Sequence, residues 1–411
     1  MADTLTAPAD FLAAAQALQP DTIALRRAIH EEPELGLDTP KTLAKVKAAL
    51  AGLPLTFKEG LSCSGMIAIL EGAKPGRTVL LRGDMDALPM PEDTAVDFRS
   101  KVQGAMHACG HDAHTSMLVS AAKVLCARRE QIAGRILFMF QPGEEGHHGA
   151  RFMIQDGLLD NPKPDAAFAI HITPNLPAGV ITAKGGAMMA SADVFNINVK
   201  GQGGHASMPH LAIDPMPVAC EIALAINAFV TRRVDAFDPT VVTIAKMEGG
   251  TTNNVIGETV RMTGTIRAIS EETRKKVHDG IARVAENVAR AHECSATVDI
   301  ERGFPVTIND NAAVNFIEAT VRREFGQGAF IRGNNPVMGA EDFSYVLQRT
   351  QGAMMFLGVC PEGADFRVAC PCHSNKMELN EAAMAYGVAA HCALAEAYLR
   401  DGLTSYAGVA K

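Results

Sequence analysis

The sequence predicts an α/β protein in which a helix-covered sheet is interrupted by a separate α+β segment. Short apolar, β-branched runs alternate with amphipathic helical stretches before residue 190 and again after residue 303. This alternation is typical of a sheet covered by helices. Between these parts, from about Ala190 to Gly303, the order changes to strand, helix, strand, strand, helix, strand. That order indicates a self-contained split βαβ layer of the ferredoxin-like kind.

The individual elements follow from hydrophobic periodicity and from the turn residues that flank each run. The strands expected in the sheet are Gly65–Leu70, Thr78–Gly83, Ile136–Gln141, Ala166–Ile170 and Ala353–Gly358. Helical patterns cover Thr22–Glu32, Thr115–Ala127 and Ala383–Leu399. The middle segment contains Asp193–Val199, Pro217–Val230, Thr240–Glu248, Thr259–Arg267, Glu272–Ala291 and Ala296–Glu301. We therefore expect residues 190–303 to be inserted into one discontinuous domain formed by residues 1–189 and 304–411.

Composition limits the classes of partner. The chain has 411 residues, of which 47% are hydrophobic and 20% charged, so it can bury a large core. Its 38 basic and 46 acidic residues give a net charge of −8 without long runs of one sign. This balance argues against an electrostatic nucleic-acid binder and favours small-molecule partners.

The sequence also suggests a cytoplasmic protein without a membrane segment. The N-terminal stretch carries Asp3 and Asp10 and lacks the basic and apolar regions of a secretory signal. No apolar run approaches the roughly 20 residues that cross a bilayer. Among the nine cysteines only Cys370 and Cys372 lie close in sequence, which suits reduced thiols better than a disulfide framework.

Two adjacent glutamates are the first candidate functional residues. In GRILFMFQPGEEGHHGA an apolar strand ends at Gln141, and a Pro-Gly turn leads to Glu144 and Glu145. Ligands of open α/β sheets bind at the carboxyl ends of strands. Neighbouring carboxylates repel each other unless a cation or a shared proton compensates, so one could bind metal while the other moves protons. A solvated acidic turn is the alternative.

A cluster of metal-binding residue types precedes the predicted helix at Thr115. The run MHACGHDAHTSM contains Cys109 and His111, whose thiolate and imidazole groups suit zinc and later first-row metals. A structural zinc site would need about four closed ligands, commonly in CxxC pairs, and this run has none. We interpret His107 and His114 as supporting residues. An ordinary hydrogen-bonded histidine remains the alternative for any one of them.

Three further motifs lie at or after predicted strand ends. His171 closes DAAFAIHI, and His373 lies in PCHSNKMELNE soon after the last strand. Asp84 and Asp86 in LRGDMDALP could orient a histidine, bind metal, or form a surface turn. Each signal is weak alone, but together they predict a site with five candidate ligands: Cys109, His111, Glu145, His171 and His373. Two ions sharing so few ligands would keep positions open for water and substrate, as catalytic sites do.

The middle segment holds one more candidate. In VKGQGGHASMPH a glycine-rich turn carries His205. Glycines permit tight turns, so this histidine can project from the loop. A solvent-exposed hairpin histidine is the alternative.

At these residues the chain resembles the aminoacylase and carboxypeptidase family of di-metal amidohydrolases, in the branch of hippurate hydrolase and indole-acetyl-amino-acid hydrolase. The matching runs cover nearly the whole chain in order: RRAIHEEPELG, GDMDALP, MHACGHDAHTSM, FQPGEEG, AIHI, GQGGHAS, GTTNNVIGE, GTIR, GAEDFS and HSNKMELNE. The resemblance implies a zinc-peptidase-like three-layer α/β catalytic domain. It also implies that the inserted ferredoxin-like part is a lid that forms a homodimer or higher homo-oligomer.

The resemblance further implies the roles of the site residues. Two divalent ions per subunit, zinc, manganese, nickel or cobalt, would be bound by Cys109, His111, Glu145, His171 and His373. Glu144 would be the general base, and His205 would reach an active site, that of the partner subunit, to stabilise the oxyanion. Asn253 and Arg267 match positions that hold the substrate, and an arginine can bind a carboxylate through two hydrogen bonds.

Two departures from the family pattern matter. The exopeptidase relatives have a metal-binding histidine where this chain has Asp84, so one ligand is supplied differently here. The run VACPCHS also differs from the shorter loop that usually precedes the last histidine. Cys370 and Cys372 in this run could be spare thiols or additional ligands.

The predicted activity is therefore hydrolysis of the amide bond of an N-acyl amino acid. A water molecule activated by two cations would lose its proton to Glu144 and attack the amide carbonyl. A di- or tripeptide exopeptidase is the second hypothesis. A metal-binding homologue without catalysis is the third, and the presence of both Glu144 and His205 argues against it.

Overall fold

The computed structural model describes residues 10–406 in two compact units. The first unit contains the chain up to Gly186, Ile308–Asn335 and the chain from Tyr345 onward. The second contains Ala187–Thr307 and Pro336–Ser344. Asp3, which contributed to the expectation of no secretory signal, lies outside the described residues.

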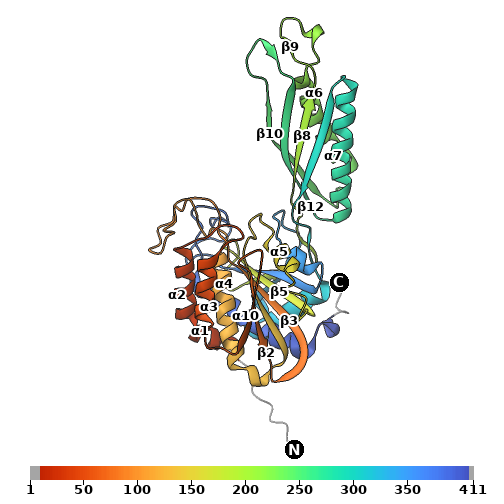
Figure 1. The fold of residues 1–411 in the computed structure, drawn as a ribbon. Coiled ribbons are helices and arrows are strands. Elements are labelled where there is room, and N and C mark those ends of the chain that lie inside the picture. Colours follow the sequence, from red (N-terminus) through yellow and green to blue (C-terminus); the bar gives the residue numbers. More distant parts are fainter. Residues whose placement is uncertain (1–9, 407–411) are drawn as a thin grey trace, which may run out of the picture. The chain divides into compact units, whose positions relative to one another are not determined.

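An eight-stranded mixed sheet forms the framework of the first unit (Figure 1). Its strands, in spatial order, are β1 (Leu55–Glu59), β2 (Met66–Glu71), β4 (Ala133–Gln141), β3 (Lys74–Asp84), β5 (Ala166–Thr173), β16 (Gln351–Gly358), β6 (Ile181–Ala183) and β15 (Phe330–Arg332). Strands β4, β3, β5 and β16 run parallel to their neighbours in this group. Their carboxyl ends therefore meet at one edge of the sheet.

Helices pack against this sheet and against one another. They are α1 (Phe11–Ala17), α2 (Gln19–His30), α3 (Pro40–Ala49), α4 (His111–Ala127), α5 (Gly149–Gln155), α8 (Asn311–Phe325) and α10 (Met384–Asp401). The short helix α9 (Ser344–Leu347) begins at the boundary between the two units. Helices α4 and α10 contact β3, while α2 packs on α4 and α1 packs on α10 (Figure 1). Across residues 10–406, no helix combines the length and apolar character that a membrane span requires.

The parallel strands are buried on both faces, so their sequences are almost continuously apolar. Alternate residues such as Leu81 and Phe138 enter the core that β3 and β4 share with α4 and α10. The five strands and three helices expected for this unit are all present. Several boundaries differ by a few residues, and one of these differences bears on the site: α4 begins at His111, directly after Gly110 with a φ of +85°, whereas the sequence predicted a start at Thr115.

The second unit confirms the split βαβ pattern. Its elements are β8 (Asp193–Lys200), α6 (Pro215–Arg233), β10 (Thr240–Gly249), β12 (Thr259–Ala268), α7 (Glu271–Ala291) and β13 (Ser295–Arg302), with the short strands β9 (Gly204–His205) and β11 (Val255–Ile256). The four long strands form an antiparallel sheet in the order β10-β12-β8-β13.

Both helices of the second unit bury one stripe against its sheet. Phe195 and Ile197 of β8 share a core with Ile222 of α6 and Ile281 of α7. Helix α7 begins where the hydroxyl of Ser270 accepts the N–H of Thr273, a standard N-terminal cap. The short strands β7 (Gly186–Met189) and β14 (Thr307–Asn309) lie where the chain passes from one unit to the other.

Candidate metal centre

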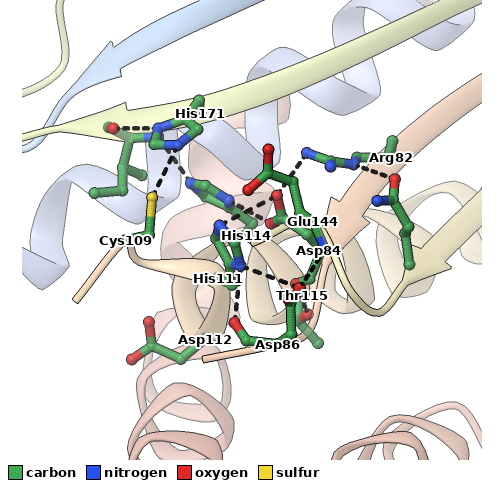
Figure 2. Close-up of polar contacts among 12 residues, drawn as sticks. Arg82, Asp84, Asp86, Cys109, His111, Asp112, His114, Thr115, Glu144 and His171 are labelled. Carbon is green, nitrogen blue, oxygen red and sulfur yellow. Dashed lines mark hydrogen bonds and ion pairs between the residues drawn. The ribbon is translucent and has the colours of Figure 1, made fainter. Parts of the chain in front are cut away.

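Polar side chains converge at the edge where the parallel strands of the first unit end (Figure 2). Asp84 is the last residue of β3, Glu144 and Glu145 follow β4, and His171 lies near the end of β5. Two other segments contribute to the same edge. Cys109 and His111 come from the turn and first residue of α4, and His373 comes from the loop after β16.

The five predicted ligands form one continuous cluster. The ligand atoms of Cys109, His111 and His171 lie within 4.8 Å of one another, and the same holds for Cys109, Glu145 and His373. His111 and Glu145 also form such a group with Glu144. Within the cluster, Cys109 Sγ is 3.3 Å from His171 Nε2, and His373 Nε2 is 3.2 Å from Glu145 Oε1.

Two buried atoms of the cluster have no hydrogen-bond partner among the described residues. They are Nε2 of His111 and Oε1 of Glu145. Buried polar atoms are almost always hydrogen-bonded, and where potential ligand atoms also converge, as they do here, such an atom is a candidate to bind a cation. The other ring nitrogen of His111, Nδ1, lies 2.8 Å from the carbonyl oxygen of Asp86 and donates to it, so in the neutral ring the lone pair is on Nε2. A metal-binding histidine has this arrangement, so the cluster fits a cation.

The local charges also favour cations. Burial alone lowers the pKa of His111, but the carboxylates of Asp84, Asp86 and Glu145 outweigh it and raise the pKa to about 10. The pKa of the Cys109 thiol is raised by a hydrogen bond with Cys372, by burial and by the negative charges of Glu145 and Glu144. The cluster thus holds protons that metal ions can replace, because ligands must be deprotonated to bind metal.

Both carboxylate oxygens of Asp84 contact other side chains of the protein. Its Oδ2 lies 2.5 Å from Nη1 of Arg82, and both side chains are buried. Its Oδ1 accepts the Nδ1–H of His114 at 2.6 Å, while Nε2 of His114 accepts the backbone N–H of Ile172 at 2.8 Å. Both nitrogens of His114 are therefore occupied by the fold. These contacts favour an orienting role for Asp84 and a supporting role for His114.

Asp86 holds the turn that carries the two glutamates. Its Oδ1 accepts the backbone N–H of Glu144, and its Oδ2 accepts that of Glu145, each at 2.9 Å. Together with the bond from His111 to its carbonyl, Asp86 connects three residues of the cluster. From the sequence, Asp86 could orient a histidine, bind metal or form a surface turn, because the D-x-D spacing does not show which groups the second aspartate contacts.

A second network, which sequence reasoning missed, fixes the start of α4. Asp112 points away from the cluster (Figure 2) and accepts from Nε of Arg26 at 2.7 Å and from Nδ1 of His30 at 2.8 Å. The three side chains are buried and tie α4 to α2. Arg26 and His30 lie in the run RRAIHEEPELG, which could have indicated this network but to which no role was assigned from the sequence.

His373 adopts a backbone conformation that is rare for a residue with a side chain. Its φ is +68°, and its backbone N–H donates to the carbonyl of Ala108 at 2.8 Å. Such a conformation costs on the order of 1–3 kcal/mol and is typical of functional sites. It brings the imidazole, whose side chain is 56% exposed, to Glu145.

The remaining predicted residues belong to the second unit. His205 is exposed in β9, and its Nδ1 accepts the Ser207 hydroxyl at 2.8 Å and the Ser207 backbone N–H at 3.1 Å. In the neutral ring the proton is therefore on Nε2, which can donate. Asn253 is exposed in the loop before β11. Arg267, in β12, is half-buried, and this burial lowers the pKa of its guanidinium.

Comparisons with known proteins find relatives over most of the chain. The family described as Peptidase family M20/M25/M40 matches residues 80–397. An IAA-amino acid hydrolase from Arabidopsis thaliana is 38% identical over 383 residues, 92% of this chain and 86% of the relative. Thermostable carboxypeptidase 2 from Saccharolobus solfataricus is 38% identical over 379 residues, 91% of this chain and 94% of the relative. The crystal structure of a Bacillus subtilis dinuclear metal binding peptidase is similar, with a TM-score of 0.82, 30% identity, and coverage of 94% of this chain and 99% of that chain.

Proposed function

Because this chain belongs to peptidase family M20/M25/M40, we propose that it hydrolyses N-acyl amino acids to a carboxylic acid and a free amino acid. At the coarser level the chain is a metal-dependent hydrolase that acts on amides. The finer proposal concerns the substrate, in which an aryl or alkyl acyl group is joined to an amino acid as in hippurate. The cluster of five potential ligands beside Glu144 supports the metal-dependent chemistry, and the similarity to an IAA-amino acid hydrolase supports this substrate class.

We assign the metal ligands to Cys109, His111, Glu145, His171 and His373, which would hold two divalent ions. Zinc, manganese, nickel and cobalt all suit this mixture of thiolate, imidazole and carboxylate. When bound, the ions supply Lewis acidity, which polarises the amide carbonyl and lowers the pKa of a water molecule.

In this proposal the two glutamates have different roles. Glu145 is assigned to metal because its Oε1 faces two other proposed ligands, at 3.2 Å from Nε2 of His373 and 3.9 Å from Nε2 of His111. Glu144 takes a proton from the attacking water and gives it to the leaving amine. Asp86 positions both carboxylates by holding the N–H groups of their backbone.

The second unit would serve as lid and dimer interface. We assign residues 190–303 to this inserted domain and residues 1–189 and 304–411 to the catalytic domain. Ser207 keeps the proton of neutral His205 on Nε2, so this exposed ring can donate a hydrogen bond to the oxyanion in the active site of the partner subunit. Asn253 and Arg267 would bind the substrate, with the guanidinium on its carboxylate. We place the protein in the cytoplasm.

A metallo-exopeptidase is the second candidate, because one similar protein is a thermostable carboxypeptidase. Both functions cleave an amide next to a carboxylate. They differ on the acyl side, where a dipeptide carries an amino group that a simple acyl group lacks.

Matched substrates test the proposal. The metal-loaded protein is assayed with benzoyl and acetyl derivatives of one amino acid, and with dipeptides that end in the same residue. We expect higher kcat/KM for the acyl derivatives. Preferential cleavage of the dipeptides would establish the exopeptidase instead.

A further inference from the structure

A second cysteine, Cys372, lies directly beside the proposed metal ligand Cys109. Cys372 Sγ is 3.9 Å from the carbonyl oxygen of Cys109 and 3.8 Å from that of Ile172. One residue away on each segment, the His373 N–H donates to the Ala108 carbonyl at 2.8 Å. This backbone bond holds the segments 108–109 and 372–373 side by side.

The two cysteines therefore lie on neighbouring segments, with the Cys372 sulfur against the backbone of Cys109. On another side, the Cys109 sulfur is 3.3 Å from Nε2 of His171. Cys372 belongs to none of the potential ligand groups among the described residues. Cys109 thus lies between the proposed metal ligands and a thiol that is not one of them.

The pair differs in exposure. Cys109 is buried, whereas Cys372 is half-buried. The loop that carries Cys372 is held in place, since the side-chain amide of Asn175 donates to the carbonyls of Phe366 and Ala369 at 3.1 and 3.0 Å. A small oxidant therefore reaches Cys372 more easily than Cys109, which lies on the neighbouring segment.

We propose that Cys109 and Cys372 are a redox modification site, at which a hydroperoxide joins them in a reversible disulfide. Cys372 Sγ attacks one peroxide oxygen and becomes a sulfenic acid, while the other oxygen leaves as water. Cys109 Sγ then attacks the sulfenic sulfur, the S–S bond forms, and a second water leaves. Two thiols and one hydrogen peroxide give one disulfide and two waters. A thiol reductant reverses the reaction by exchange.

This disulfide and metal binding exclude each other, a consequence that rests on the proposed role of Cys109 as a ligand. The Cys109 sulfur cannot bind a cation as thiolate while it is bonded to Cys372. Only the metal-free fraction of the protein can then form the disulfide. With metal at about one hundred times its dissociation constant, disulfide formation is expected to slow about a hundredfold, because about one molecule in a hundred is metal-free.

The experiment treats the full-length protein with hydrogen peroxide, once after removal of metal by a chelator and once with added zinc. Disulfide-linked peptides are identified by mass spectrometry without reduction, and bound metal is measured before and after reduction. Cys372→Ser is the test variant. Cys370→Ser is the matched control, because Cys370 is an exposed cysteine of the same loop.

We expect a peptide linking Cys109 to Cys372 in the metal-free protein, its loss in Cys372→Ser and its persistence in Cys370→Ser. Reduction should restore metal binding. Absence of this peptide from the metal-free protein, or a bond to Cys370 in its place, would overturn the proposal and leave the proposed hydrolase function intact. If the disulfide forms equally fast with and without zinc, the proposed disulfide is supported but Cys109 is not a metal ligand.

Discussion

Asp86 fixes the backbone of Glu144, since its Oδ1 accepts the Glu144 N–H at 2.9 Å while its other oxygen accepts the next N–H along the chain. Two carboxylates that follow a Pro-Gly turn would otherwise separate to reduce their repulsion. The negative charge of Asp86 is stabilised by these N–H groups, and in return it sets the direction of both glutamates.

Replacing Asp86 therefore tests this positioning. Asp86→Ala removes both acceptors, and we expect metal affinity or kcat/KM to fall by about 10–100-fold, as is typical for residues that orient metal ligands. Asp86→Asn keeps one acceptor oxygen, so we expect a smaller fall in metal affinity and kcat/KM. Equal loss in the two variants, measured by steady-state kinetics and metal titration, would argue against this role.

The two glutamates should respond differently to the same substitution. Glu144→Gln is expected to lower kcat by roughly two or more orders of magnitude with bound metal unchanged, because it removes the proposed base. Glu145→Gln should reduce bound metal, because it weakens a proposed ligand. Metal analysis beside kinetics separates the two effects. Near-normal turnover of Glu144→Gln would show that another group moves the proton.

His205 should affect turnover without affecting metal. We expect His205→Ala to lower kcat by about 100-fold or more, the loss typical of one oxyanion donor, at unchanged metal content. Dimers that combine His205→Ala subunits with Glu144→Ala subunits test where the histidine acts. Such mixtures regain activity if His205 serves the partner subunit. If they stay as inactive as the parent variants, the histidine acts within its own subunit or not at all.

The buried His30 should make stability depend on pH. Burial alone lowers its pKa, but Asp112 and Glu92 outweigh burial and raise the pKa from 6.5 to about 9. The contacts of protonated His30 stabilise the folded state fully below pH 6.5. This stabilisation is lost as the pH rises through about 9 and the folded protein releases the proton. The rise of the His30 pKa corresponds to about 3 kcal/mol in the free energy of unfolding. The difference in unfolding free energy between the parent protein and His30→Gln should shrink over this interval; a constant difference would contradict the assignment.

A buried ion pair should stabilise the second unit. Asp193 and Arg274 are buried with 2.5 Å between Oδ1 and Nη2, and His278 and the Gly303 N–H also contact Asp193. Asp193→Asn would remove the buried partner of the guanidinium and leave it only Glu271, which is partly exposed, at a cost of about 3 kcal/mol in unfolding free energy. Asp279→Asn is the control, since Asp279 pairs with Lys275 on the surface and should change stability little. Similar melting curves for both variants would refute this difference.

The sequence by itself determined the elements of the fold. Apolar β-branched runs such as Ile136–Gln141 and Ala166–Ile170 predicted buried parallel strands, because a sheet covered on both faces requires apolar residues at every position. The start of α4 was predicted at Thr115 instead of His111 because His111, Asp112 and His114 are polar yet buried. Hydrophobic patterns do not identify polar residues that are buried with partners of their own.

Only the tertiary structure decided which of these side chains meet. Strand ends marked Glu145 and His171 as candidates, but the groups within 4.8 Å of one another combine residues far apart in the chain. The same holds for Asp86 with Glu144, Arg26 with Asp112, and Cys372 with the backbone of Cys109. Local sequence specifies local backbone structure, whereas these contacts depend on the order of parallel strands in the sheet and on the loops that leave their carboxyl ends.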